Sequence, residues 1–198
     1  MIKEALHQIV SYPVIYDALQ NLLGYPQICE RLKPHFDQFE NHSVLDVGAG
    51  TGAIASRLPG GTRYLWMDAD ALKLKGFQSK SPASSPAVLA DATRMCLKDK
   101  SIDFAFCGAL VHHLDGGQLA RFFPALAKVI RKKLLLFEPI ETPSRISRLL
   151  WEYDRGSFPR REEEIIASIE SGFQIVHREI FSVVHHYLLC LAVPKNET

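Results

Sequence analysis

Short apolar runs separated by glycine, proline and polar residues are the dominant pattern of the chain. A short apolar run bounded by such residues is typical of a buried strand. Five of these runs are predicted to be strands: residues 43–47, 64–67, 87–90, 102–107 and 133–137. Residues 173–180 and 185–193 predict two more strands at the C-terminal end, where they would pair as a hairpin.

Helical spacing of apolar residues alternates with these runs. Residues 1–42 favour helices, because apolar residues recur at Val14, Ile15, Ala18 and Leu22 and again at Ile28 and Leu32. Proline is common at the first position of a helix, so we expect helix starts near Pro13 and Pro26, with a break at Gly24. Further helices are predicted at residues 53–58, at 118–131 and, as a pair, within 144–171. Residues 79–87 are rich in serine and proline and predict a surface loop.

Alternating strands and helices predict an α/β fold with a mostly parallel sheet covered by helices on both faces. We expect seven strands with an antiparallel strand at the C-terminal end and a helical cap at the N-terminal end. In such sheets ligands bind beyond the carboxyl ends of the strands. Acids lie at or near three predicted strand ends: Asp68, Asp91 and Glu138.

Composition narrows the classes of function. The 198 residues are 47% hydrophobic and 23% charged, with a formal net charge of +1, so the total charge gives no sign of a nucleic-acid partner. The total charge does not exclude a local basic patch.

The four cysteines form no CxxC pair, and His, Asp and Glu show no metal-ligand spacing, so we expect neither a metal nor a disulfide framework. The N-terminus lacks the apolar run of a signal peptide, and residues 187–193, the longest apolar run, are too short to span a bilayer. A cytoplasmic protein without membrane insertion is therefore expected, and its oligomeric state is open.

The turn after the first strand carries the clearest chemical signal. Gly48, Gly50 and Gly52 follow the strand directly, and glycine lets a backbone bend tightly and approach a ligand closely. Asp68 comes 20 residues after Gly48, at the end of the next strand, where a carboxylate can accept hydrogen bonds from ribose hydroxyls. The two features predict a ligand that contains adenosine.

The glycine pattern also fits a dinucleotide site, because Gly48, Gly50 and Ala53 satisfy its fingerprint. Asp46 argues against that alternative. A pyrophosphate would be disfavoured by an anion two residues before the first glycine, whereas a sulfonium cation would be favoured by it.

The set of motifs resembles the class I methyltransferases, which use S-adenosylmethionine (SAM). Residues 44–52 (VLDVGAGTG) resemble the family's first motif and Asp68 its second-motif acid, while residues 89–92 and 99–104 resemble the third motif and the approach to the fourth strand. Residues 110–114 (LVHHL) resemble a segment of small-molecule methyltransferases, including the ubiquinone and menaquinone type. The resemblance spans residues 43–140 and implies a Rossmann-like fold. It divides a single domain into a cap (1–42), a cofactor-binding core (43–140), substrate-capping helices (141–171) and C-terminal strands (172–198).

The resemblance also implies roles for individual residues. Asp46 would lie near the methionine amino group and Asp68 would hold the ribose. Asp91 would accept from the adenine amino group, with the Ala92 backbone amide nearby. Met67, Ala69 and Met95 would enclose the adenine ring, although core packing is an equal alternative for the two methionines. The expected cofactor-binding residues are Asp46, Gly48, Ala49, Gly50, Gly52, Met67, Asp68, Ala69, Asp91, Ala92, Cys107 and Gly108.

Methyl transfer from a sulfonium needs mainly alignment of the acceptor, the methyl group and the sulfur. A base is required only when the acceptor must lose a proton, and His112 and His113 are the candidates because histidine titrates near neutrality. Helix capping or a structural role is the alternative for each. His185 and His186 are expected to be structural, since neighbours in a strand face opposite sides.

Four residues are candidates for binding the acceptor. Tyr12 and Tyr16 lie in the leading helices, which in related enzymes cover the cofactor, and core packing is the alternative for both. Arg145 belongs to an arginine-rich segment that would suit an anionic acceptor or simply form ion pairs on a helix face. Tyr153 lies in the same segment, where the family places substrate-capping insertions.

Three other functions compete with a small-molecule methyltransferase. The first is a nucleic-acid methyltransferase. Such enzymes methylate bases with an Asn/Asp-Pro-Pro-aromatic motif or a Pro-Cys nucleophile, whereas this chain has Cys107-Gly108-Ala109-Leu110 at the fourth strand, so a small-molecule acceptor is favoured. A protein methyltransferase and a non-catalytic cofactor-binding scaffold are left open by the motifs.

Overall fold

The computed structural model describes residues 15, 24–82, 85–143, 151, 158–184 and 186–195. The predicted substrate residues Tyr12, Tyr16, Arg145 and Tyr153 lie outside these described residues, as does His185.

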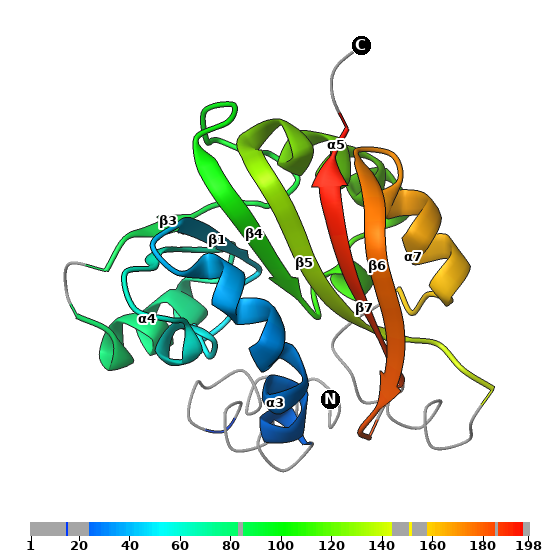
Figure 1. Ribbon diagram of the computed structural model, residues 1–198, viewed down its shortest axis with the longest axis horizontal. Coiled ribbons are helices and arrows are strands. Elements are labelled where there is room, and N and C mark those ends of the chain that lie inside the picture. The colour runs from blue at the N-terminus through cyan, green and yellow to red at the C-terminus, as the bar shows by residue number, and fades with distance from the viewer. Residues whose placement is uncertain are drawn as a thin grey trace, which may run out of the picture.

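A seven-stranded sheet forms the centre of the molecule, with the order β3-β2-β1-β4-β5-β7-β6 (Figure 1). Its strands are β1 (Ser43–Val47), β2 (Arg63–Asp68), β3 (Ala87–Leu89), β4 (Ile102–Gly108), β5 (Ile130–Ile140), β6 (Phe173–Ser182) and β7 (His186–Pro194). The first five strands run parallel, and β7 is antiparallel to both β5 and β6. The predicted mostly parallel sheet with an antiparallel C-terminal strand is confirmed.

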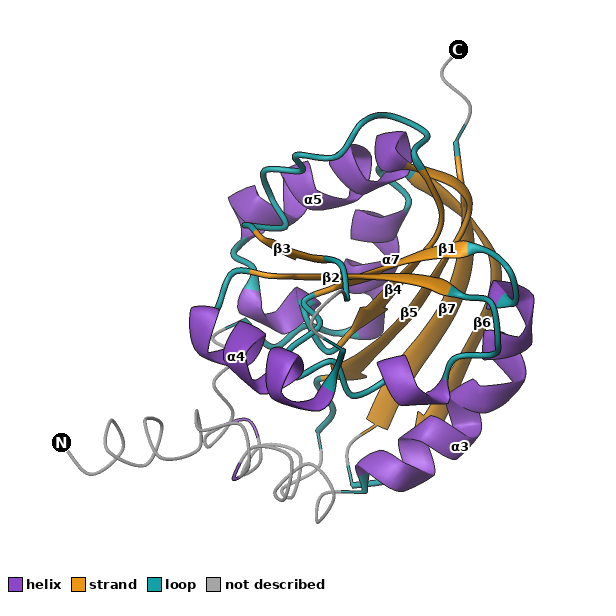
Figure 2. Ribbon diagram, turned by 90° about the vertical axis from the view of Figure 1, so that its left-hand side faces the viewer, coloured by secondary structure: helices purple, strands orange, loops and turns teal. Residues whose placement is uncertain are grey.

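Helices lie on both faces of this sheet, as predicted (Figure 2). The described α-helices are α3 (Tyr25–Phe36), α4 (Ala71–Lys80), α5 (Gly116–Val129) and α7 (Glu162–Ile169), and the 3-10 helices are η1 (Asp37–Phe39), η2 (Ala55–Arg57) and η3 (Val111–His113). α3 and α4 cover one face of the sheet, and α5 lies on the opposite face in Figure 2. None of the helices in the described part of the chain is long and apolar enough to cross a membrane.

Each face of the sheet has its own hydrophobic cluster, because successive side chains of a strand point to opposite faces. Leu45, Val47 and Cys107 pack with α5 and α7 on one face. Val44 and Phe106 pack with α3 on the other face. The alternation places Asp46 on the α3 face, beneath the turn that follows β1.

Two local predictions were wrong, and one helix was not predicted. Residues 53–58 form turns and the short η2 rather than a helix. The helix α4 was not predicted, because its lysines interrupt the apolar pattern, although Asp70 caps it by accepting from Leu72 N at 2.8 Å. β5 runs from Ile130 to Ile140 and α5 therefore ends at Val129, so Glu138 lies within a strand instead of at its end.

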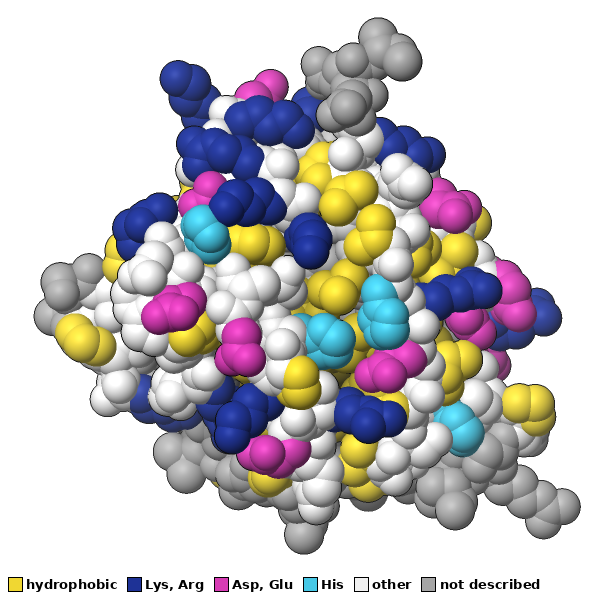
Figure 3. Space-filling model, in the orientation of Figure 1, with side chains coloured by type: hydrophobic (Ala, Val, Ile, Leu, Met, Phe, Trp, Pro, Cys, Tyr) yellow, Lys and Arg dark blue, Asp and Glu magenta, His cyan; other side chains and the backbone are white. Residues whose placement is uncertain are grey.

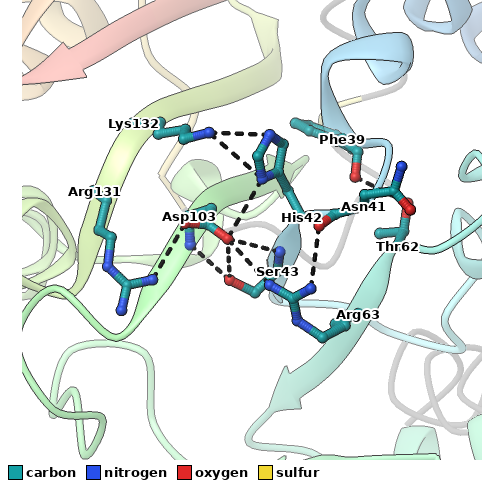
Figure 4. Close-up of polar contacts among 9 residues, drawn as sticks. All are labelled: Phe39, Asn41, His42, Ser43, Thr62, Arg63, Asp103, Arg131 and Lys132. Carbon is teal, nitrogen blue, oxygen red and sulfur yellow. Dashed lines mark hydrogen bonds and ion pairs between the residues drawn. The ribbon is translucent and has the colours of Figure 1, made fainter.

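The amino ends of four strands meet at the carboxylate of Asp103 (Figure 4). This carboxylate accepts hydrogen bonds from Ser43 N at 3.0 Å and Ser43 Oγ at 2.8 Å, and it pairs with Arg131 at 3.2 Å and Arg63 at 3.5 Å. Figure 3 shows dark blue basic side chains gathered at the end of the sheet where β4 and β5 begin. Asp103 therefore joins β1, β2, β4 and β5 at the end opposite the glycine turn.

Candidate functional site

The turn after β1 has the backbone shape that glycine makes possible. Gly48, Gly50 and Gly52 have φ values of +71°, +54° and +73°, in the region that other residues rarely adopt. The amides of Gly48 and Ala49 donate to Met67 O at 2.9 Å and 3.0 Å, which ties the turn to the end of β2. At Gly52 a Cβ atom would collide with the ring of Phe77.

A cleft of about 670 Å³ opens beside this turn. That volume is within the range of about 300–1,000 Å³ typical of small-molecule sites. Its walls include the predicted residues Asp46, Gly48, Ala49, Gly50, Gly52, Gly108 and His112. The structure thus brings the glycine turn, the end of β4 and one of the two candidate bases to a single cleft.

Asp46 lines the cleft and is only 3% exposed. Its Oδ2 accepts a hydrogen bond of 2.6 Å from the Tyr64 hydroxyl, an uncharged donor. Burial raises the pKa of Asp46 to about 7; the Tyr64 hydrogen bond lowers it, and the nearby Asp68 charge raises it further. A cation placed in the cleft would stabilise the Asp46 carboxylate.

Asp68 closes β2 behind the turn, and it is not among the residues that line the cleft. Its Oδ2 accepts from Gly50 N and its Oδ1 from Asp70 N, both at 2.9 Å. A carboxylate oxygen has two lone pairs, so each oxygen can accept one more donor. These two bonds orient the carboxylate while leaving it able to hold a diol.

The other predicted cofactor residues differ in their placement. Met67 and Cys107 are fully buried in the hydrophobic cluster under α5, and Ala92 is 9% exposed there. Ala69 and Asp91 are exposed beyond β2 and β3. Asp91 Oδ1 accepts from Thr93 N and Oγ1 at 2.8 Å, and these bonds lower the pKa of Asp91. Side-chain contact with a ligand in the cleft is therefore available to Asp46 but not to Met67 or Cys107.

His112 and His113 occupy different environments although they are adjacent. His112 is buried, and its Nδ1 contacts Glu138 Oε1. His113 is exposed and does not line the cleft. Their ring centroids are 4.2 Å apart, and the centroids of the His112 and Trp151 rings are 5.5 Å apart in a T-shaped arrangement. The structure thus separates the two candidates and places only His112 at the cleft.

An aromatic wall lies beyond Gly108. The rings of Phe106 and Phe137 are 5.8 Å apart, and those of Phe137 and Tyr187 are 6.1 Å apart. All three line the cleft, and a Cβ atom at Gly108 would collide with Phe137. These rings form an apolar part of the cleft wall that adjoins Asp46, because Phe106 pairs in register with Asp46.

Three contributors to the site were not identified from the sequence. Glu138 was noted as an acid near a strand end, but its contact with His112 could not be inferred. Tyr64 and Tyr25 line the cleft, and burial raises the pKa of both. The alternation of β2 was a usable signal for Tyr64, because Tyr64 pairs in register with Val44 and points to the same face as Asp46.

Comparison with known families supports a methyltransferase. Residues 45–137 match the model of a methyltransferase domain family. None of the curated proteins compared with the sequence matches it.

Solved methyltransferases share the fold at low sequence identity. Magnesium protoporphyrin IX methyltransferase from Synechocystis PCC 6803, solved with bound SAH, aligns with a TM-score of 0.74 and 14% identity over 97% of this chain and 100% of its own. The PH0226 protein from Pyrococcus horikoshii OT3 gives a TM-score of 0.70 and 16% identity, with 86% and 91% coverage. A SAM-dependent methyltransferase from Aquifex aeolicus gives 0.63 and 19%, with 83% and 88% coverage.

The matched domain covers the glycine turn, Asp68, Asp91 and His112, and the sheet has the strand order described above. Residues 45–137 therefore form a methyltransferase domain, and the chain shares the Rossmann-like fold of solved SAM-dependent methyltransferases.

Proposed function

We propose that this protein transfers the methyl group of SAM to a small molecule bound in the cleft beside the glycine turn. The acceptor lies against the aromatic wall, and the methionine part of SAM lies over Asp46. SAM supplies an activated methyl group, so the protein acts mainly by aligning the acceptor with it.

The buried carboxylate of Asp46 is the observation that carries this proposal. Burying a carboxylate away from a cation is costly, and here the cost appears as a pKa raised to about 7. The methionine moiety of SAM carries an ammonium group and a sulfonium, either of which would offset that cost. A site for a pyrophosphate would gain nothing from Asp46.

Asp68 holds the ribose in this proposal. The bonds from Gly50 N and Asp70 N fix its carboxylate at the end of β2, and its remaining lone pairs accept from the two ribose hydroxyls. Asp91, beyond β3, accepts a hydrogen bond from the adenine amino group, with the Ala92 amide nearby. Met67 acts from the core, by shaping the end of β2 rather than by touching the adenine.

The apolar wall argues for an acceptor that is itself largely apolar. Phe106, Phe137 and Tyr187 would bury such a molecule next to Gly108, where the end of β4 faces the methyl position. Tyr12, Tyr16, Arg145 and Tyr153 remain candidates for further acceptor contacts. His112 is the base, and His113, which is exposed, acts at most at the rim.

Binding of S-adenosylhomocysteine (SAH) tests the cofactor assignment. Isothermal calorimetry should detect SAH but not NAD. Asp68→Ala should weaken SAH binding by about 1–3 kcal/mol, because the ribose hydroxyls lose their acceptor. Asp99→Ala removes an exposed aspartate that precedes β4, and it is the matched control because its SAH affinity should equal that of the unmodified protein.

Tight binding of NAD alone would contradict the cofactor assignment, and equal SAH affinity of Asp68→Ala and the control would place the ribose elsewhere. Incubation with SAM labelled in its methyl group and a fractionated cell extract tests transfer. Label should enter the small-molecule fraction. Label in nucleic acid or protein would favour the corresponding methyltransferase, and no transfer despite SAH binding would favour a scaffold.

A further inference from the structure

We propose that Glu138 is a positioning residue that fixes His112 as a base with Nε2 as its proton acceptor, and that the methyl acceptor therefore loses a proton on methylation. This inference rests on the proposed function, because it concerns the same cleft. It assigns a role to a residue that the cofactor motifs do not include.

Glu138 is completely buried in β5 and holds the segment after β4. Its Oε2 accepts from Val111 N at 3.0 Å, and its Oε1 accepts from His112 N at 3.0 Å. The same Oε1 contacts His112 Nδ1. One carboxylate thus fixes both the backbone and the ring of His112.

The contacts of Glu138 determine which ring nitrogen carries the proton. An ionised carboxylate is an acceptor only, so Nδ1 must donate to Oε1. In the neutral imidazole Nε2 is then the nitrogen without a proton. His112 is among the residues that line the cleft, and the proposal therefore assigns its Nε2 the proton of an acceptor bound there.

The same segment is held from its other side by Arg160. The Arg160 guanidinium donates to Val111 O at 2.8 Å and to Leu114 O at 2.6 Å, and Phe158 N donates to His112 O at 3.0 Å. The amides of Val111 and His112 therefore donate to Glu138, while the carbonyls of this segment accept from Arg160 and Phe158. Such fixed geometry is what alignment of a base with its substrate requires.

Within the described part of the chain, the charged and titratable groups around the His112 ring are consistent with a base. Glu138 faces it from β5, His113 lies beside it on η3, and Arg160 binds the carbonyls of the same segment. The negative charge of Glu138, in direct contact with the ring, stabilises the imidazolium that forms when Nε2 takes a proton.

The transfer step then balances as follows. The acceptor X–H gives its proton to His112 Nε2, and its electron pair forms the X–CH₃ bond. The CH₃–S bond breaks, and its electron pair stays on sulfur, which gives neutral SAH. The imidazolium later releases the proton to water, and Glu138 remains a carboxylate throughout. The acceptor class is therefore a hydroxyl, an acidic carbon or an amine that carries hydrogen, not a thioether or a tertiary amine.

Nitrogen NMR of the full chain with ¹⁵N-labelled histidine tests the contact between Glu138 and His112. A His112→Gln variant assigns the signals of His112. The expected result is the Nδ1–H tautomer for His112, with a titration midpoint that falls by about 1 pH unit or more in Glu138→Gln. His177, exposed on β6, is the internal control and should keep its midpoint.

The Nε2–H tautomer in the unmodified protein, or an unchanged His112 titration midpoint in Glu138→Gln, would overturn the proposal that Glu138 positions His112. The tautomer is measured on the unmodified protein, so this measurement tests the proposal even if Glu138→Gln does not fold. If the protein binds SAH but His112 has the Nε2–H tautomer, only the role of Glu138 is contradicted. If His112 has the Nδ1–H tautomer but the protein does not bind SAH, only the proposed function is contradicted.

The product of the labelled-extract assay tests the acceptor class. A thioether or a tertiary amine would give a permanent cation, which a cation exchanger retains even at strongly alkaline pH. We expect the labelled product to pass through the exchanger under those conditions. Retention of the label would overturn the claim that the acceptor loses a proton.

Discussion

At the scale of single residues, Asp46 shows how stability and binding oppose each other. It is buried on the α3 face of β1, with the Tyr64 hydroxyl as its hydrogen-bond donor. Burial raises the pKa of Asp46 to about 7, so the folded protein binds its proton more tightly than the unfolded chain does. The contribution of Asp46 to stability therefore declines as pH rises from about 4 through 7. A residue that costs stability at neutral pH fits a role in binding.

Asp46→Asn should therefore stabilise the ligand-free protein by roughly 1–3 kcal/mol at pH 8, because no buried carboxylate remains to be ionised. At pH 5, where Asp46 is already protonated, the difference should be small. The same variant should bind SAH at least about tenfold more weakly, since the ammonium loses its counterion. Urea unfolding at the two pH values and calorimetry with SAH measure these effects. An equal change in stability at both pH values would show that Asp46 is not the titrating group.

At the scale of elements, the short segment between β4 and α5 carries the chemistry. η3 holds His112, and α5 begins three residues after η3 ends, at Gly116. A capping box starts the helix: Gln118 N donates to Asp115 Oδ1 at 2.7 Å, and Asp115 N donates to Gln118 Oε1 at 2.8 Å. The cap therefore fixes the point at which the chain leaves His112 and enters the helix.

Asp115→Ala should lower the free energy of unfolding by about 1 kcal/mol, the usual effect of losing an N-cap acceptor. Asp115→Ser keeps an acceptor at the same position and should retain most of the stability. Urea denaturation of both variants measures the difference. If alanine and serine have the same effect, the cap does not stabilise α5.

At the scale of the whole molecule, Asp103 joins four strands at the end of the sheet opposite the cleft (Figure 4). Its side chain is 12% exposed, whereas Arg63 and Arg131 are 66% and 47% exposed. Burial alone would raise the pKa of Asp103, but the Ser43 hydrogen bonds and Arg131 outweigh it and lower the pKa to about 2. Exposed ion pairs contribute little, so the bonds to Ser43 account for most of the stabilisation.

Asp103→Asn should destabilise the protein by about 2 kcal/mol at pH 7. The folded-state pKa is depressed, so this stability is present above about pH 4 and is lost as pH falls towards 2. The difference between the variant and the unmodified protein should therefore shrink at pH 2–3. Unfolding followed by circular dichroism across this range measures it, with Asp99→Asn as an exposed control. A difference independent of pH would contradict the assignment.

The strands, their mostly parallel arrangement and the glycine turn could be predicted from the sequence, because apolar periodicity and the conformational freedom of glycine are local properties. It did not reveal α4, whose lysines mask its buried face, or the extension of β5 to Ile140. The contact of Glu138 with His112, the contact of Tyr64 with Asp46 and the exposure of His113 became evident only in the folded structure. These contacts join residues from different strands and loops, and sheet register and packing, rather than spacing along the chain, bring them together.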